Sequence, residues 1–412
     1  TSMRISYLIV LMLMISITSC NKKDDQSLIP AELQSQFEVM LDNEMTKYVQ
    51  KYPSYPGGIA LQVFVKGEPY FMASHFDEAV NSGFHFRAAS NTKTFTAAAV
   101  LLLHQQGKLN IDHLLTDTIP GTDQLYLPNT AAYAIPFKDE ISIVDVLRHR
   151  AGIFDVTNDS IPHSVVADVP YKGHFYLEYV MDQDEDHTFT PEELISVVAQ
   201  TELYYFEPGA DYHYSNTGYS VLARIIERVS GQSYQDFIIQ NLVTPMGLIN
   251  TTVPVLGSDQ QMPEPFFSGY VLQNQQVYDV TASNISGNVA EGNIITTPYE
   301  LALFIRKLLS GNGPLTSYTV NSMMMNVLPV NTTTTYAYGC GLSLTNGLGY
   351  GHNGAHEGYL SLMAYDPEND ISIVVVTNTW NLTNGMGSLY EQLGGLMVDV
   401  AYKAKNIAKE GS

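Results

Sequence analysis

The chain has 412 residues, 45% of them hydrophobic and 15% charged, with a formal net charge of −22. This length allows two or three domains, or one large core with a second domain inserted in it. The acidic balance argues against a nucleic-acid partner, because binding to phosphates depends on Lys and Arg. The two cysteines, Cys20 and Cys340, are too few for a disulfide framework or a cysteine-based zinc site.

The first segment of the chain predicts export. Its apolar run over residues 7–17 is too short to cross a bilayer of roughly 30 Å as a helix, which needs about 20 residues, so residues 1–19 are typical of a secretory signal peptide. The "ITSC" that ends at Cys20 resembles the lipobox of bacterial lipoproteins. This resemblance implies that Cys20 is lipidated and that residues 20–34 form a polar tether to a membrane of the bacterial cell envelope. An ordinary signal peptide cleaved nearby is the alternative.

Helix and hairpin signals follow the tether. Residues 31–50 have an amphipathic pattern that predicts a helix. The next segment alternates apolar and polar residues and turns at Lys66-Gly67-Glu68, which predicts a β-hairpin. A second helix is expected to hold Ser90 and Lys93 and to end near Gly107.

Ser90 and Lys93 form an S-x-x-K pattern in "SNTK". Helical spacing of three places both side chains on one face, and a helix N-terminus favours negative charge on the serine oxygen. A buried Lys loses its proton more easily, because desolvation disfavours the ammonium form. The pattern therefore indicates an activated nucleophile. The alternative is an exposed helix cap beside a solvated lysine.

Helix signals dominate the middle of the chain, and β-rich segments return beyond residue 330. These patterns predict an α+β fold, in which N- and C-terminal strands share one antiparallel sheet that helices cover. We expect residues 35–90 and 290–408 to form the sheet domain. Residues 91–289 would form an inserted, mostly helical domain, with the active site at the interface.

Two later motifs accompany Ser90 and Lys93. Tyr214-Ser215-Asn216 precedes a helical segment, and His352-Asn353-Gly354 opens a strand-like run. With these motifs in the order "SNTK", "YSN" and "HNG", residues 35–400 resemble the serine β-lactamase and penicillin-binding family. The similarity is to the branch that holds class C β-lactamases, D-Ala-D-Ala carboxypeptidases and related esterases.

The resemblance implies a role for each motif residue. Ser90 would attack the substrate carbonyl and become acylated, and both Lys93 and Tyr214 are candidates for the general base. Asn216 would hydrogen-bond Lys93 and the substrate. The oxyanion hole would be formed by the backbone N–H groups of Ser90 and Ala355.

The third motif departs from the family pattern. His352 stands where Lys is common, and Asn353 replaces a Thr or Ser hydroxyl, although His352, Asn353 and Gly354 are still expected to bind substrate. Both changes weaken the case for efficient β-lactam hydrolysis. A metal site at His352 and His356 is disfavoured, because a helical H-E-x-x-H motif needs Glu after the first His. No metal or other cofactor is expected.

The sequence thus predicts a serine hydrolase that acts on D-alanyl peptides, D-amino-acid amides or small esters. Its substrate would be a small molecule or a peptide derived from peptidoglycan. The alternatives are a class C-like β-lactamase with weak turnover and a non-catalytic receptor that resembles penicillin-binding proteins. The patterns do not indicate an oligomeric state.

Overall fold

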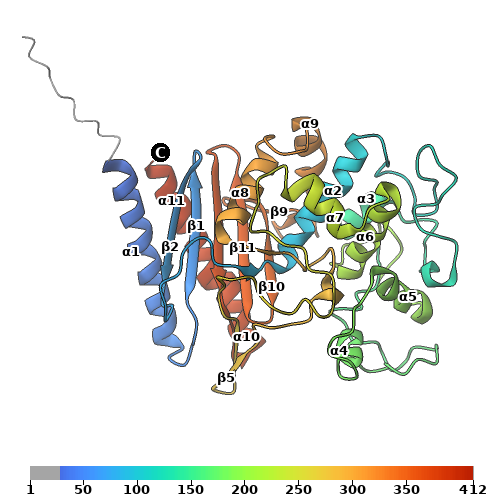
Figure 1. The fold of residues 1–412 in the computed structure, drawn as a ribbon, viewed down its shortest axis with the longest axis horizontal. Coiled ribbons are helices and arrows are strands. Elements are labelled where there is room, and N and C mark those ends of the chain that lie inside the picture. Colours follow the sequence, from blue (N-terminus) through green and yellow to red (C-terminus); the bar gives the residue numbers. More distant parts are fainter. Residues whose placement is uncertain (1–27, 412) are drawn as a thin grey trace, which may run out of the picture.

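The computed structural model describes residues 28–411, and they are built around an antiparallel sheet of eight strands (Figure 1). The strand order is β2-β1-β12-β11-β10-β9-β8-β7. The bounds are β1 (Ile59–Val65), β2 (Glu68–Ser74), β7 (Leu328–Pro329), β8 (Ala337–Tyr338), β9 (Ser343–Thr345), β10 (Gly349–His356), β11 (Tyr359–Asp366) and β12 (Ile371–Thr377). Strands from the two ends of the chain are neighbours, since β1 pairs with β12 from Ile59 opposite Thr377 to Val65 opposite Ile371. This pairing confirms the predicted α+β fold.

The central strands are buried on both faces, because alternate side chains point to opposite sides of a sheet. In β1, Leu61 and Val63 join one apolar core, and Ala60 and Phe64 join the other. Helices α1 (Leu28–Lys51) and α11 (Val398–Glu410) cover the first face, and α10 (Met386–Glu391) continues into the π-helical segment η7 (Gln392–Met397) beside them. Figure 1 shows α1 and α11 side by side at one end of the molecule.

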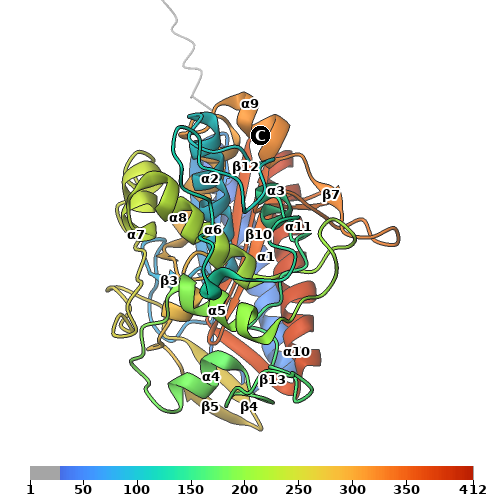
Figure 2. The same cartoon turned by 90° about the vertical axis from the view of Figure 1, so that its right-hand side faces the viewer.

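The second face carries the larger core. Helix α8 (Pro298–Leu309) packs on β1, β11 and β12, and helix α2 (Thr92–Gln105) lies further from the sheet, against α6 (Asn216–Ser230) (Figures 1 and 2). The remaining helices of the middle region are α3 (Ile143–Leu147), α4 (Tyr176–Met181), α5 (Pro191–Thr201) and α7 (Tyr234–Ile238), with the short turns η3 (Ala131–Tyr133) and η4 (Ile239–Val243). Short helical pieces α9 (Ser317–Thr319) and η6 (Val320–Met324) precede β7.

Two small sheets complete the fold. Strand β3 (Phe86–Arg87) pairs with β6 (Ile295–Thr296), and β13 (Thr379–Gly385) pairs with β4 (Tyr270–Gln273), which pairs with β5 (Gln276–Asp279). The 3-10 turn η2 (Ala89–Asn91) follows β3 in the sequence, and the 3-10 turn η5 (Ser286–Asn288) precedes β6. The β3–β6 sheet brings the segment before Ser90 next to the segment after residue 290.

Two expectations at the element ends need correction. Helix α1 begins at Leu28 and not at residue 31, so it includes residues 28–34 of the segment predicted as a tether. Ser90 lies in the turn η2 and not inside the helix that holds Lys93, because α2 begins at Thr92. The predicted signal peptide and Cys20 lie outside the described residues. Within the described part of the chain, no helix is both long and apolar enough to cross a membrane. The proposed domain boundaries stay predictions.

Candidate active site

Ser90 lies in a strained turn at the edge of a cleft of about 320 Å³. The turn is held by the β3–β6 pairing and by a 2.9 Å hydrogen bond from Ala88 N to Ile294 O. The preceding residue, Ala89, has a φ of +48°, a left-handed conformation that L-residues other than Gly adopt only at a cost of about 1–3 kcal/mol. The surrounding contacts thus hold the serine in a local conformation that this short turn would not favour alone.

Lys93 is fully buried, and its ammonium group donates three hydrogen bonds. Its Nζ donates to Ser90 Oγ at 3.2 Å, to Glu291 O at 2.9 Å and to Glu291 Oε2 at 3.1 Å, which accounts for the three N–H bonds of an ammonium group. Burial lowers the pKa of Lys93, and the Glu291 carboxylate opposes that change. The reading of Lys93 as a solvated lysine beside an exposed cap is therefore wrong.

Tyr214 reaches Ser90 from the segment that precedes α6. Its side chain lines the cleft together with Ser90, and Lys93 Nζ lies 4.8 Å from the centroid of its ring. Burial raises the pKa of Tyr214 well above 10, and the Ser90 side chain opposes that change. At neutral pH the hydroxyl is therefore protonated in the resting site. The structure brings Ser90, Lys93 and Tyr214 together, while their catalytic roles stay predictions.

Asn216 lines the same cleft. The hydrogen bond to Lys93 that the resemblance implied for Asn216 is not formed. Its Nδ2 donates to Thr157 Oγ1 at 2.8 Å, and its backbone N–H donates to Asp155 Oδ2 at 3.1 Å. Its Oδ1 is buried without a hydrogen-bond partner among the described residues. The expected lysine contact is absent because Ser90 and Glu291 together occupy the three donor positions of Lys93.

Glu291 is the site residue that the motifs did not predict. Its side chain is 4% exposed, and its Oε1 accepts a hydrogen bond from Asn288 Nδ2 at 2.5 Å. Burial raises the pKa of Glu291, and Lys93 opposes that change. In the sequence, the only signal is a single acidic residue among small and apolar ones in "NVAEGNII", just before the strand that pairs beside Ser90.

The third motif lies on β10, next to the nucleophile turn. Asn353 and Ala355 line the cleft with Ser90, as expected for a substrate contact and for part of an oxyanion hole. Gly354 does not line it; a Cβ on Gly354 would lie 2.3 Å from Ala88 O, so the glycine lets β10 approach the turn. The substrate-binding role predicted for Gly354 is thus replaced by a packing role.

His352 is likewise behind the cleft and not in its lining. Its Nδ1 lies 2.6 Å from Asn353 O and must donate to that carbonyl, so Nε2 accepts from the hydroxyl of Tyr338 at 2.9 Å. Burial and the nearby Lys93 lower the pKa of His352 to about 3. The ring is therefore neutral at pH 7 and is positioned to support β10, not to contact a substrate in the cleft.

The cleft is polar, and its lining, among the described residues, contains no Lys or Arg side chain. Four carboxamides line it, from Asn158, Asn216, Asn288 and Asn353, together with His356 and Trp380. Burial, with Arg87 nearby, lowers the pKa of His356 to about 4, so this ring is also neutral at pH 7. Within residues 28–411, no group of three or more His, Cys, Asp or Glu side chains is arranged to hold a metal ion.

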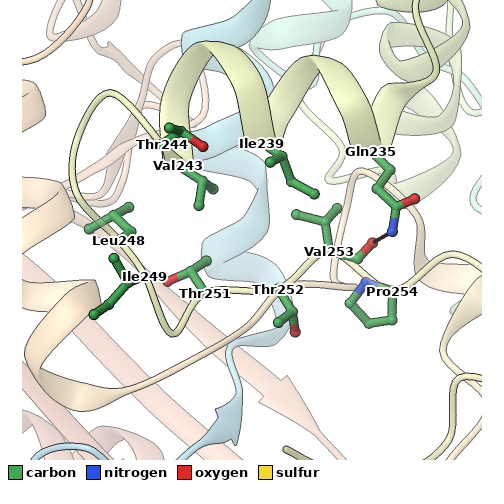
Figure 3. Close-up of a pocket in the computed structure, with 10 residues that line it drawn as sticks. All are labelled: Gln235, Ile239, Val243, Thr244, Leu248, Ile249, Thr251, Thr252, Val253 and Pro254. Atoms are coloured by element: carbon green, nitrogen blue, oxygen red, sulfur yellow. Dashed lines mark hydrogen bonds between the residues drawn. The ribbon is translucent and has the colours of Figure 1, made fainter.

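A second cavity of about 450 Å³ lies away from Ser90, between the helical residues 235–244 and the segment 248–254 (Figure 3). Its lining includes the apolar side chains of Ile239, Val243 and Leu248, and Gln235 Nε2 donates to Val253 O at 2.8 Å across it. None of its lining residues is titratable. Of these two cavities, the Ser90 cleft is the one lined by acid–base groups.

This fold and site define a class of protein. The family model described as "Beta-lactamase" matches residues 45–392, and the chain belongs to that family of serine hydrolases. Among curated relatives, penicillin-binding protein 4 of Amycolatopsis lactamdurans is 26% identical over 378 residues, which cover 83% of this chain and 86% of the relative. Penicillin-binding protein 4* of Bacillus subtilis is 24% identical over 71% of this chain, and the match spans only 60% of that protein.

Solved structures share the fold. The D-amino acid amidase from Ochrobactrum anthropi SV3, in its complex with L-phenylalanine amide, has a TM-score of 0.71 at 23% identity, covering 92% of this chain and 99% of its own. A D-stereospecific amidohydrolase from Streptomyces sp. has a TM-score of 0.68 at 24% identity, covering 87% of this chain and 98% of its own. At these identities the similarity establishes the fold.

Proposed function

We propose that this protein is a metal-independent serine hydrolase that acts through an acyl-enzyme on Ser90. The observation that carries the proposal is the convergence of three segments on one hydroxyl. Ser90 Oγ lies at the cleft, 3.2 Å from Lys93 Nζ, and Tyr214 lines the same cleft. A nucleophile beside groups that can take up and return its proton is the arrangement that acyl transfer requires.

The proposed reaction has two stages. Ser90 Oγ attacks the substrate carbonyl and loses its proton to the neighbouring groups, and the oxyanion receives N–H donors from Ser90 and Ala355. Collapse of this intermediate expels an alcohol or amine, which takes up the proton that Ser90 lost. Water then attacks the acyl-enzyme by the reverse proton path and releases the acid.

Of the predicted substrate classes, D-amino-acid amides and small esters are the proposed substrates, ahead of D-alanyl peptides. Among the described residues that line the cleft, none offers a permanent positive charge, because Lys93 is fully buried and His356 is neutral. A substrate carboxylate next to the scissile bond would find no ion-pair partner there. Amides and esters therefore fit the cleft better than carboxylate-bearing β-lactams or peptides that end in D-alanine.

A membrane-bound location in the cell envelope is part of the proposal and rests on the lipobox-like sequence at Cys20. Labelling cells that make the full chain with an alkyne fatty acid would test this part. The label should be attached to the wild type and be lost in Cys20→Ser.

The function is tested by a substrate panel on the purified protein. The panel contains p-nitrophenyl acetate, D-alanine amide, D-Ala-D-Ala peptides and nitrocefin, each with wild type and Ser90→Ala. We expect hydrolysis of the ester and the amide to exceed that of the other two, and to fall by at least about 10³-fold in Ser90→Ala. Equal turnover by the variant, or nitrocefin as the best substrate, would overturn the corresponding part of the proposal.

A further inference from the structure

Glu291 is a buried carboxylate in direct contact with Lys93, and none of the motifs that predicted the site includes it. Glu291 Oε2 lies 3.1 Å from Lys93 Nζ, and Lys93 Nζ lies 3.2 Å from Ser90 Oγ. Both distances are within hydrogen-bond reach, so the three groups form a continuous line from the nucleophile to the carboxylate. Asn288 Nδ2 holds the other oxygen, Oε1, at 2.5 Å and so fixes the direction of the carboxylate.

The activation of Ser90 requires a group that can accept the proton of its hydroxyl. A lysine paired with a carboxylate is an ammonium group, which has no lone pair to accept the serine proton. Tyr214 is protonated as well, since burial raises the pKa of its hydroxyl. A further acceptor is therefore needed, and Glu291 is the carboxylate that forms an ion pair with Lys93 among the described residues.

We propose that Glu291 is the final acceptor of the Ser90 proton and that it acts through Lys93; this inference rests on the proposed acyl-enzyme function. As Ser90 Oγ bonds to the substrate carbonyl carbon, its proton moves to Lys93 Nζ while a proton of Lys93 moves to Glu291 Oε2. Lys93 stays an ammonium group, Glu291 becomes a neutral acid, and the negative charge moves to the carbonyl oxygen. When the intermediate collapses, the proton returns along the same line and leaves with the alcohol or amine, which restores the Glu291 carboxylate.

The electrostatics of the pair support this exchange. Burial lowers the pKa of Lys93 and raises that of Glu291, which brings the two proton affinities closer and eases transfer between them. Other titratable groups also interact electrostatically with the pair. Those that interact with Glu291 are Asp155, Tyr214 and Tyr234, and those that interact with Lys93 are Asp155, His149 and His352. Asp155 favours the protonated form of both members of the pair.

The test is the pH dependence of kcat/KM for an ester in Glu291→Gln. Glutamine keeps the size of the side chain but cannot take up a proton, so activity then requires Lys93 itself to lose one. We expect kcat/KM near pH 7 to fall by about 10²-fold, within the range of general acid–base contributions. The acidic limb of the profile should also move up by at least about one pH unit, since the protonated pair in the wild type loses its first proton from the carboxyl group. Glu291→Asp, which keeps a carboxylate, should restore the position of the limb.

A matched control is Glu300→Gln, which makes the same change at another buried glutamate. Glu300 is 3% exposed and accepts hydrogen bonds from Asn250 Nδ2 at 2.9 Å and Thr251 Oγ1 at 2.6 Å, outside the cleft. This variant should leave the acidic limb in place even if the protein becomes less stable. An acidic limb that is unchanged in Glu291→Gln, with an activity loss no greater than in Glu300→Gln, would overturn the proposal.

A second measurement separates this inference from the proposed function, because it needs no turnover. In protein labelled with ¹³Cε-lysine, the resonance lost in Lys93→Met reports the titration of Lys93. The pairing predicts that Lys93 titrates at a lower pH in Glu291→Gln than in the wild type, because the ammonium loses its counter-charge. An unchanged titration would contradict the inference. A wild type that hydrolyses nothing in the panel would instead contradict the proposed function.

Discussion

At the scale of residues, the site depends on a buried ion pair. Lys93 and Glu291 are each 3% exposed or less, and moving one such charge out of water costs several kcal/mol unless its partner is present. Each charge is therefore retained only because the other is there. Lys93 of this pair also donates to Ser90 Oγ. A substitution in the pair should therefore change both the stability of the protein and the chemistry at Ser90.

This dependence predicts strong coupling in stability. Lys93→Met leaves the Glu291 carboxylate without its ion-pair partner, and we expect the free energy of unfolding at pH 7 to fall by about 3–5 kcal/mol. The double variant Lys93→Met/Glu291→Gln should recover much of that loss, because no unpaired charge is left. Urea denaturation of the four proteins of the cycle measures the coupling. Additive effects, within about 0.5 kcal/mol, would show that the two groups are independent.

At the scale of elements, the site forms where the edge of β10 meets the turn η2. A Cβ on Gly354 would lie 2.3 Å from Ala88 O and 2.8 Å from Asn91 Nδ2. The absence of a side chain at this position lets the strand carry Asn353 and Ala355 to the cleft beside Ser90. The geometry of the predicted oxyanion hole thus depends on one close backbone approach.

A substitution at this contact should lower activity more than its size suggests. We expect Gly354→Ala to displace β10 from η2, to reduce the free energy of unfolding by about 1–3 kcal/mol, and to reduce kcat by 10-fold or more, roughly. Gly394→Ala is the control, since a Cβ there meets nothing within 4 Å and the residue lies in the helical segment η7. Ester turnover and thermal melting of both variants measure the effect. Equal behaviour of the two variants would contradict the packing role.

The motifs predicted much of this site because their chemistry is local. The spacing of Ser90 and Lys93, and the order of the three motifs, indicated the three side chains that the structure places near one another, Ser90, Lys93 and Tyr214. The partner of Lys93 was not predictable, because Glu291 is 198 residues away in sequence and reaches it only through the pairing of β3 with β6. The orientations of His352 and Asn216 also depend on Tyr338 and Thr157, which no motif includes.

At the scale of the whole molecule, the central strands of the sheet are buried on both faces, and on β10 His352 is buried and His356 is partly buried. His352 and His356 both lie on β10, and burial lowers their pKa values to about 3 and about 4 from an ordinary value of 6.5. The unfolded chain therefore takes up protons near pH 6.5 that the folded chain takes up only at much lower pH. The contribution of these residues to stability is complete above pH 6.5 and is lost as the pH falls through the interval down to the folded pKa values.

This linkage predicts that the protein loses stability between pH 6.5 and 4, by up to about 1.4 kcal/mol per pH unit for each such histidine. His352→Gln should be less stable than wild type at pH 7 but should show a shallower pH dependence. The exposed His163, changed to Gln, is the control and should keep the wild-type slope. Urea midpoints measured at several pH values supply the slopes. A His352→Gln slope as steep as that of the wild type would show that folding does not lower the pKa of this ring.

The activation of Ser90 is measured by peptide mapping with mass spectrometry after reaction with a fluorophosphonate. The reagent phosphonylates an activated serine, and we expect one adduct, on the peptide that contains Ser90, with none in Ser90→Ala. Folded wild-type protein that takes up no reagent, or an adduct on any other residue that persists in Ser90→Ala, would contradict this expectation.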